Sequence, residues 1–344
     1  MSGRVASRPR VLVIRFGSLG DVVLATAVLE ALAAETPAAE VDFVTKEAHA
    51  ALFDGDPRVA RVIRFRRRLA PVLSAIVRTR YDRVYDLHAT ARSRLAALVA
   101  RAPEKRTVDK RSRERRALLR GADPSPRLDG GVVGWYGELL GRALPRPRLD
   151  AARRGGAARA LLAERGVARG SVAVAPGARR ATKAWPPRLV ADFVRAAAAS
   201  DRDRPLHLVG GPEEAGLVAE LSAATGAPFV VPPLDLLPGV LAETPVLVTG
   251  DSAPLHVAEA VGTPVIALFG PTVAAFGFAP RDPRSTRIEV DLSCRPCSLH
   301  GEPSCPLGHH LCLAAIEPSR VVDALREALA LVREPAFGVS GGAL

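Results

Sequence analysis

A chain of 344 residues with 48% hydrophobic side chains can bury two cores of ordinary domain size, and its 4% aromatic content leaves the packing to alanine, valine and leucine. The net charge of +12 predicts anionic partners, although a bias towards arginine accounts for part of it. No apolar run approaches the roughly 20 residues of a membrane span. The polar opening Met1–Arg10 precedes an apolar stretch too short for a secretion signal, so we predict a cytoplasmic protein with at most peripheral membrane contact.

Short apolar stretches alternate with helical patterns in the first part of the chain. The predicted strands are 10–16, 41–44, 61–65 and 83–87. Apolar positions from Gly20 to Leu32 follow helical spacing, and Pro37 lies beyond the helix end. Residues 101–130 break the alternation because arginines and lysines crowd there with few apolar partners, so we predict a loop, followed by a helix around Trp135.

The same alternation restarts after a segment rich in proline, arginine and glycine at 142–156, where we place a domain linker. We therefore predict one domain over 1–150 and a second over 151–344. The second contains predicted strands at 171–175, 206–209, 245–249 and 264–269, and predicted helices at 186–199 and 318–332. Strands that alternate with helices predict an α/β protein with mainly parallel, doubly wound sheets.

A glycine-containing turn follows the first predicted strand. Gly17 and Gly20 keep this turn open, and Asp21 stands at the start of the next helix. Ligands of doubly wound folds bind at the carboxyl ends of strands, so this carboxylate could take a proton from an attacking hydroxyl. The alternative is that Asp21 only favours the helix N-terminus by its charge. The turn lacks the GxGxxG pattern, which argues against a dinucleotide-dependent dehydrogenase.

A basic loop follows the first predicted strand of the second domain. Arg179 and Lys183 would place positive charge beside a bound diphosphate, and Thr182 adds a hydroxyl. The stretch 185–187 predicts the start of the next helix because it places proline in the first turn. The alternative interpretation is a solvated basic loop without a ligand.

Two more polar turns follow strands of the second domain. Glu213 and Glu214 compete for one role there, either holding ribose hydroxyls or favouring a helix N-terminus. Asp251 could accept hydrogen bonds from sugar hydroxyls, and Ser252 is a suitable N-cap for a helix whose first N–H groups would face an anion. His256, one turn into that helix, is either a ligand-binding residue or a buried structural histidine.

Four cysteines gather near the C-terminus, with histidines between them. In a cytoplasmic chain this density suits a structural tetrahedral zinc better than a disulfide framework. Only the first pair forms a CxxC, so reduced buried cysteines and an iron–sulfur site stay as alternatives. We place the predicted zinc outside the catalytic centre. The predicted ligands are Cys294, Cys297, Cys305 and Cys312.

The ordered set of motifs resembles glycosyltransferase family 9, the ADP-heptose–lipopolysaccharide heptosyltransferases. The resemblance runs from about residue 10 to 330, and the cysteine block resembles one found in many bacterial members. It is carried by 13–21, by 175–178 with Lys183 and 185–187, by 210–213, by 250–256 with Ala258, by 262–264 and by 267–272.

This resemblance implies a GT-B architecture, in which two Rossmann-like domains face each other across a cleft. It implies an inverting transfer of heptose from ADP-heptose to the lipid A-linked inner core of lipopolysaccharide, with Asp21 as the base and Lys183 at the donor phosphates. The implied acceptor-side turn contains Ser18 and Gly20. The other implied donor-binding residues are Arg179, Thr182, Glu213, Asp251, Ser252, Ala253 and His256.

The charged residues at the predicted site are consistent with a transfer reaction that requires no cofactor. Positive charge from Lys183, Arg179 and the helix start near Ser252 can neutralise the leaving diphosphate. The arginines of 101–120 and 64–68 could dock an anionic lipid acceptor at the inner membrane. The family usually has a glycine where this chain has Ala253. The extra methyl group could change how closely the donor approaches the start of the helix.

Two other functions compete with this interpretation. One is a family 9 enzyme that uses another nucleotide sugar or another cell-surface glycan acceptor. The other is a non-catalytic nucleic-acid-binding protein, which the net charge suggests. We predict no nucleic-acid partner, because aromatic residues are scarce and do not interleave with the basic runs.

Overall fold

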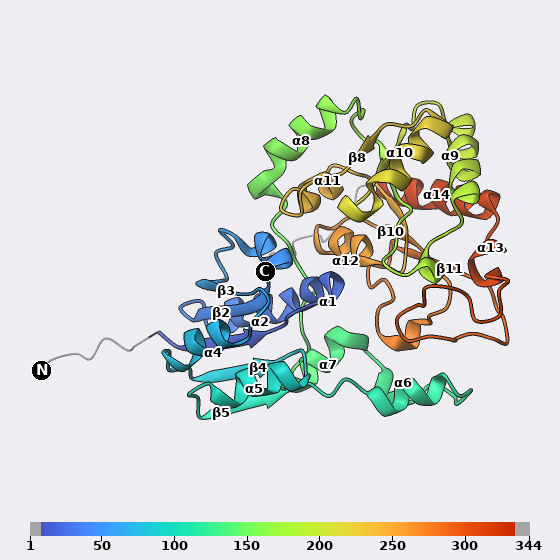
Figure 1. The fold of residues 1–344 in the computed structure, drawn as a ribbon. Helices are drawn as coiled ribbons and strands as arrows, with labels where there is room; N and C mark the ends of the chain where they lie inside the picture. Colours follow the sequence, from blue (N-terminus) through green and yellow to red (C-terminus); the bar gives the residue numbers. More distant parts are fainter. Residues whose placement is uncertain (1–7, 334–344) are drawn as a thin grey trace, which may run out of the picture.

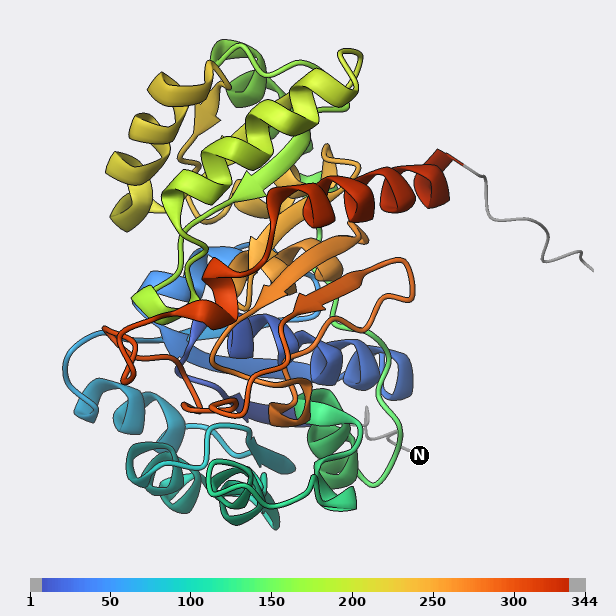
Figure 2. The same cartoon turned by 90° about the vertical axis from the view of Figure 1, so that its right-hand side faces the viewer.

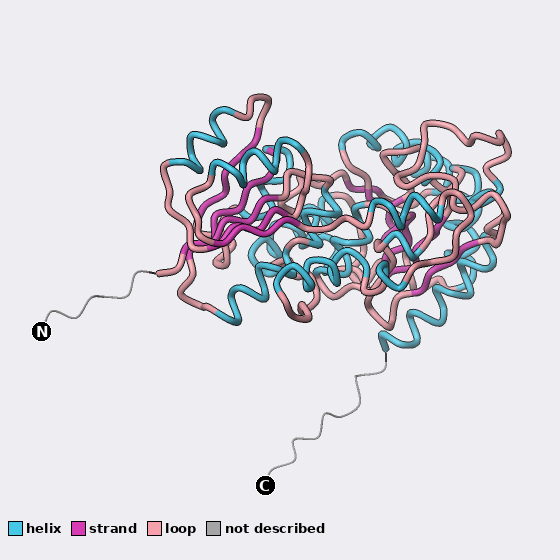
Figure 3. Tube along the Cα trace, turned by 90° about the horizontal axis from the view of Figure 1, so that it is seen from below, coloured by secondary structure: helices cyan, strands magenta, loops and turns pink. Residues whose placement is uncertain are grey.

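The structure, a computed structural model, describes residues 8–333. Most of the polar opening Met1–Arg10 and the last eleven residues of the predicted second domain lie outside the described residues. The chain forms two parallel sheets with helices around them, one built from the first part of the chain and one from the second (Figure 1). Seen from below, the strands form two separate groups with helices and loops between them (Figure 3). The predicted α/β class is confirmed.

The first sheet has the strand order β3-β2-β1-β4-β5, and all its strand pairs are parallel. Strand β1 is central because four of its five residues are apolar and buried, as suits a strand covered by helices on both faces. The elements of this part of the chain are β1 (Arg10–Ile14), α1 (Leu19–Leu24), α2 (Thr26–Glu35), β2 (Glu40–Lys46), α3 (Glu47–Ala50), β3 (Arg61–Phe65), α4 (Ala70–Val77), β4 (Arg83–Asp86), α5 (Ala91–Val99), β5 (Glu104–Thr107), α6 (Ser112–Leu118) and α7 (Gly131–Leu140).

The second sheet has the order β11-β10-β9-β6-β7-β8 and is also parallel throughout. Helices α9 and α14 pack side by side on one face of it (Figure 2). The elements of this part are α8 (Gly155–Glu164), β6 (Val172–Ala175), α9 (Pro187–Ser200), β7 (Leu206–Val209), α10 (Ala215–Thr225), β8 (Phe229–Val230), α11 (Leu237–Ala242), β9 (Leu247–Gly250), α12 (Ala253–Ala260), β10 (Val265–Phe269), β11 (Thr286–Glu289), α13 (Leu311–Ala314) and α14 (Pro318–Arg333).

Two expectations about the first domain were wrong. The basic segment 101–120 is not a loop: it supplies the edge strand β5 and the helix α6. Its charged residues suit an edge strand, because only one side of such a strand is covered and charge discourages pairing with other chains. The single helix predicted from Gly20 to Leu32 is two helices, α1 and α2, which meet at Ala25.

The two sheets are joined through direct contacts between helices. Helix α1 of the first part lies against α12 of the second (Figure 1), and one hydrophobic cluster includes buried residues of both, such as Val22 and Leu255. Two consecutive amides in the connecting segment bind one helix from each part of the chain. The N–H of Arg148 donates to Thr26 Oγ1 of α2 (2.9 Å), and the N–H of Leu149 donates to the carbonyl of Ala260 of α12 (2.9 Å). The exact boundary at 150/151 stays a prediction.

Membrane-spanning segments are not found in the part of the chain that the structure describes. None of the helices between residues 8 and 333 combines the length and the apolar character that crossing a bilayer requires.

Candidate active site

The polar turns predicted from the sequence lie at the switch points of the two sheets. The turn before Asp21 follows β1, which is flanked by β2 and β4. The loop that contains Lys183 follows β6, and the turn at Asp251 follows β9, the neighbour of β6. In both sheets the strand order reverses here, which is where the carboxyl ends of strands leave a crevice for ligands.

Asp21 is held by contacts to both of its carboxylate oxygens. Arg15 Nη2 lies 2.6 Å from Oδ1, and the Ser18 hydroxyl donates to Oδ2 at 2.7 Å. The backbone N–H of Ser18 also donates to Oδ2 (3.2 Å), so Asp21 does stabilise the start of α1, as the alternative interpretation expected. The carboxylate keeps 15% of its side-chain surface exposed, which leaves it accessible to a ligand.

The charge of Asp21 is set by opposing effects. Burial raises the pKa of the carboxyl, but the Arg15 guanidinium and the Ser18 hydroxyl outweigh it and lower the pKa below its ordinary value. Arg15 is itself buried and also donates to the carbonyl of Leu87 at the end of β4. Asp21 is therefore a carboxylate at neutral pH, in a fixed orientation.

The turn at Gly20 touches the second domain. A methyl carbon on Gly20 would stand only 2.6 Å from Cδ2 of His256, so α1 and α12 approach this closely only because residue 20 is glycine. Burial lowers the pKa of His256 to about 4, although Asp251 and Asp21 oppose this shift. His256 is thus neutral at pH 7, and within residues 8–333 its Nδ1 has no hydrogen-bond partner.

Lys183 and Asp251 form an ion pair beside the start of α12. Lys183 Nζ lies 2.7 Å from Asp251 Oδ2, and the Thr272 hydroxyl donates to the same oxygen (2.7 Å). Ser252 is the N-cap residue, as predicted, but its hydroxyl contacts that of Thr249 (3.2 Å) and makes no capping hydrogen bond among the described residues. Ala253 is the first helical residue and is half-buried.

The donor-binding role of Thr182 stays a prediction, and its hydroxyl is already engaged with another loop. Its buried hydroxyl accepts from the Glu302 N–H (2.7 Å) and donates to the Glu302 carbonyl (3.0 Å). A hydroxyl buried between two backbone groups stabilises the loop it joins and has little capacity left for a ligand. Its backbone carbonyl is equally engaged, with His310 Nε2 at 2.9 Å.

In the loop after β7, Glu214 takes the helix N-terminus role, which leaves Glu213 as the glutamate available to a ligand. The side chain of Glu214 packs against Gly177, in the loop after β6, and accepts from the Gly211 N–H (2.9 Å), whereas Glu213 is exposed. Glu214 stands three residues after Gly211 and binds its N–H, which is the glutamate half of a capping box and a signal that could have distinguished the two glutamates. Arg179 is also exposed.

Two basic residues beside Asp21 were not singled out by the sequence analysis. The guanidinium of Arg115, on α6, lies 5.4 Å from the ring centroid of Trp135 and is buried, yet its Nε has no hydrogen-bond partner in the described chain. Burial and the nearby Arg15 lower the pKa of Lys110, which is half-buried. Both come from the segment predicted as an arginine-rich loop, where nothing in the pattern identifies the inward-facing residues.

The zinc site at the four cysteines stays a prediction. Within residues 8–333, no three cysteine, histidine, aspartate or glutamate side chains are placed to share a metal ion. Cys312 is buried in the hydrophobic core of the second domain, and burial raises its pKa to about 11, so it is a thiol. Cys297 is exposed on the surface. The four cysteines form no disulfide among the described residues, and no chemistry below depends on a metal.

Comparison with known proteins gives the family. Residues 70–306, more than half of the chain, match the model of glycosyltransferase family 9 (heptosyltransferase). A curated relative, lipooligosaccharide heptosyltransferase 2 of Campylobacter jejuni, is 29% identical over 80 residues, which span 23% of this chain and 24% of the relative. The aligned stretch therefore covers about a quarter of that protein.

Solved structures share the fold. The ADP-heptose lps heptosyltransferase II of E. coli superposes with a TM-score of 0.73 at 22% identity, covering 94% of this chain and 100% of that one. The E. coli heptosyltransferase WaaC with ADP gives a TM-score of 0.63 at 20% identity, covering 93% and 99%. These likenesses confirm the predicted GT-B architecture. With the family match over residues 70–306, they lead to one conclusion: the chain belongs to glycosyltransferase family 9.

Proposed function

We propose that this protein is an inverting glycosyltransferase that moves heptose from ADP-heptose to the lipid A-linked inner core of lipopolysaccharide. One observation carries the proposal: His256, which contacts Gly20 of the first sheet's turn, is close enough to Asp21 and to the Lys183–Asp251 pair to feel the charges of all three. An acceptor-activating group and a group for the leaving phosphates thus lie around one histidine. Support for the donor comes from relatives, since E. coli WaaC was solved with ADP and with ADP-2-deoxy-2-fluoro heptose.

Asp21 acts on the acceptor in this proposal. An acceptor hydroxyl oxygen attacks the anomeric carbon of the donor from the face opposite the diphosphate, and its proton passes to a carboxylate oxygen of Asp21. Arg15 keeps that carboxylate charged and oriented, so it is ready at neutral pH. A carboxylate with a lowered pKa is a weak base, so proton transfer accompanies formation of the new C–O bond, when the hydroxyl becomes acidic.

The second domain stabilises the leaving group. The bond from the anomeric carbon to the diphosphate oxygen breaks, and its electron pair stays on that oxygen. Lys183 is half-buried and would exchange part of its contact with Asp251 for a phosphate oxygen. The first N–H groups of α12, which Ser252 does not cap, would face the same charge. Asp251 is then free to accept hydrogen bonds from the sugar.

The acceptor in this proposal carries negative charge. Arg115 is buried beside the site without an ion-pair partner in the described residues, and Lys110 is half-buried nearby. A buried cation is costly unless an anion or a hydrogen-bond acceptor compensates it. A carboxylate or phosphate group on the acceptor would supply that compensation next to Asp21.

A second candidate is a family 9 enzyme with another nucleotide sugar or acceptor. The observation in its favour is Ala253, whose methyl group stands at the first helical position of α12, next to Ser252 and Asp251. The helix start is where the donor phosphates would approach most closely. Comparing several ADP- and UDP-sugars in one assay decides between the two candidates.

The test is a transfer assay with ADP-heptose and a heptose-deficient lipid acceptor, in which ADP release and product are both measured. Asp21→Asn keeps the shape of the side chain but removes its capacity as a base, and we expect kcat to fall by at least about 100-fold. ADP affinity should stay unchanged. The matched control is Asp123→Asn, at an exposed carboxylate. Wild-type turnover by Asp21→Asn would disprove the assignment of the base.

A further inference from the structure

One side of helix α5 is exposed and apolar at its centre. Leu98 keeps 71% of its surface exposed and Leu95 keeps 41%, which makes Leu98 the most exposed large hydrophobic residue among those that the structure describes. The opposite side of the helix packs on the first sheet through Ala96, Ala97 and Ala100. The leucines are one helical turn apart and therefore form one small patch.

Cations surround this leucine patch. Arg92 precedes Leu95 by three positions, Arg94 precedes Leu98 by four, and Arg101 follows Leu98 by three; all three arginines are exposed. Within residues 8–333 none of the three arginines forms an ion pair. The helix itself contains no acidic residue. We call these five residues, Arg92, Arg94, Leu95, Leu98 and Arg101, the α5 face.

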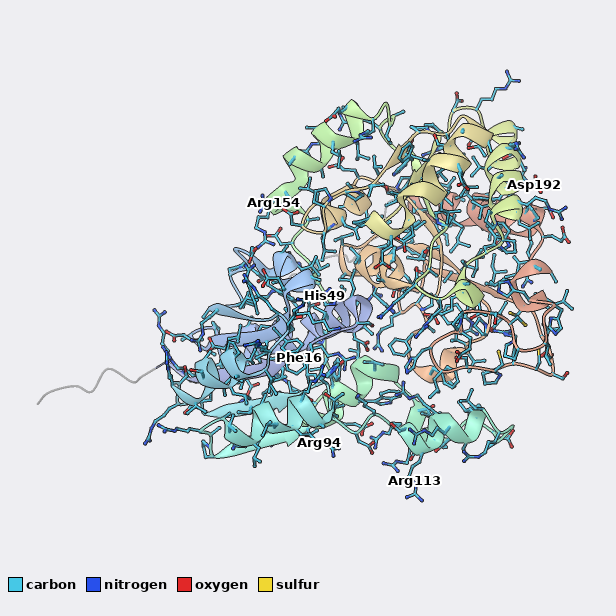
Figure 4. The ribbon with its side chains drawn as sticks, viewed as in Figure 1. Phe16, His49, Arg94, Arg113, Arg154 and Asp192 are labelled. Carbon is cyan, nitrogen blue, oxygen red and sulfur yellow. The ribbon has the colours of Figure 1, made fainter. Side chains whose placement is uncertain are left out.

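The basic character continues beyond the α5 face. Lys105 Nζ donates to the carbonyl of Leu98 (2.8 Å), which places another positive charge at the end of α5. Figure 4 shows the side chains of Arg94 and Arg113 along the lower edge of the first domain, where Arg113 belongs to α6. Helix α6 also provides Arg115 to the acceptor side of the candidate site. The α5 face and the acceptor side therefore belong to the same domain, and basic residues of α5 and α6 lie along the edge between them.

We propose that the α5 face docks on an anionic lipid bilayer. Leucines that insert at the boundary between headgroups and acyl chains, flanked by arginines that reach lipid phosphates, are the features of an interfacial helix. The arginine stems can lie along the bilayer while their guanidinium groups stay at the headgroups. This inference rests on the proposed function for its setting, because it names the surface through which an enzyme with a lipid-linked acceptor would meet the membrane.

Other partners fit the α5 face less well. Single strands of nucleic acid bind basic grooves through aromatic side chains on which bases stack, and the α5 face contains none. A stable protein interface needs a buried apolar core larger than two leucines. A bilayer requires neither aromatic side chains nor a large apolar core. It accommodates a small apolar patch, and its anionic headgroups attract each surrounding positive charge.

The experiment measures binding to vesicles of phosphatidylcholine with and without phosphatidylglycerol, by co-sedimentation and without any sugar substrate. We expect binding that requires phosphatidylglycerol and weakens with salt. Each arginine near an anionic surface contributes about fivefold to the partition coefficient, so Arg92→Gln with Arg94→Gln should lower it about 30-fold. Leu95→Gln with Leu98→Gln should lower it about tenfold or more, since leucine insertion is favourable.

The matched control removes one exposed arginine and one exposed leucine from the second domain, by Arg188→Gln with Leu331→Gln. If this control weakens vesicle binding as much as the α5 variants do, or if the α5 variants bind like wild type, the inference is wrong. Turnover on a water-soluble acceptor fragment separates this result from the proposed function. The α5 variants should retain that turnover, whereas failure of the wild type to transfer sugar would overturn the proposed function alone.

Discussion

Substituting Gly20 by alanine should push the two domains apart at the candidate site. The new methyl carbon would lie 2.6 Å from Cδ2 of His256, whereas carbon atoms in contact prefer about 3.5–4.0 Å. Helices α1 and α12 would therefore have to separate by about 1 Å at this point, or the buried imidazole would have to turn. Overpacking of this kind costs about 1–3 kcal/mol.

The cost should appear in catalysis more than in folding. Because the clash lies between the domains, the protein can relieve it by separating α1 from α12, which disturbs only the part of the shared cluster around Val22 and Leu255. A closed arrangement that is destabilised by about 1–3 kcal/mol corresponds to a loss of about 5- to 150-fold in kcat/KM, if transfer requires closure. The assay measures kcat/KM for sugar transfer and the thermal midpoint of unfolding for Gly20→Ala. Gly216→Ala on α10 is the control, since its new methyl group meets no atom within 4 Å.

A double-mutant cycle tests whether the contact itself is responsible. In the His256→Ala background the imidazole is absent, so Gly20→Ala should cost little further activity, although His256→Ala has an effect of its own. Equal losses from Gly20→Ala with and without His256 would refute the reasoning. Wild-type activity of Gly20→Ala would refute it as well, because a 2.6 Å contact cannot be accommodated without movement.

Three further predictions follow from the site. Arg15→Gln removes the guanidinium that lowers the pKa of Asp21, so the acidic limb of the pH profile of kcat/KM should move to higher pH; an unmoved limb would argue against Asp21 as the titrating base. Thr182→Val leaves the Glu302 N–H without its partner, while the Glu302 carbonyl still accepts from the Thr182 N–H, so we expect about 1–3 kcal/mol less stability by denaturant unfolding with unchanged ADP affinity once folded. Glu213→Gln should weaken nucleotide binding in a titration, whereas Glu214→Gln should leave that affinity nearly unchanged because its carboxylate is bound to the Gly211 N–H; the reverse order would disprove the assignment of Glu213.

Much of the fold could be predicted from apolar patterns, and the exceptions share a cause. Strands β1, β6 and β7 lie inside their sheets and are almost wholly buried, so their apolar residues mark them clearly. Strands β5 and β11, with the sequences EKRT and TRIE, lie at sheet edges. An edge strand is held by backbone hydrogen bonds on one side and tolerates charge, so its sequence resembles a loop.

The candidate site was predicted at the level of loops but not of all side chains. The predicted positions of Asp21, Lys183 and Asp251 after strands place all three at the switch points of the two sheets, because parallel strands end on the same edge. Which side chain of a loop points inward depends on packing from distant segments. Thr182 faces the backbone of Glu302, and Arg115 turns towards Trp135 on another helix. Neither partner is adjacent in sequence, so no local pattern could reveal them.

The connecting segment constrains how the molecule can open. The amide of Arg148 is bound to Thr26, at the first residue of α2, and the next amide, of Leu149, is bound to Ala260, at the last residue of α12. Neighbouring peptide units therefore bind helices that belong to different sheets, and we expect this point to act as a hinge. Sliding of one domain along the other would break both hydrogen bonds, while rotation about Arg148–Leu149 preserves them. We expect opening to swing the α1–α12 contact along an arc around this hinge.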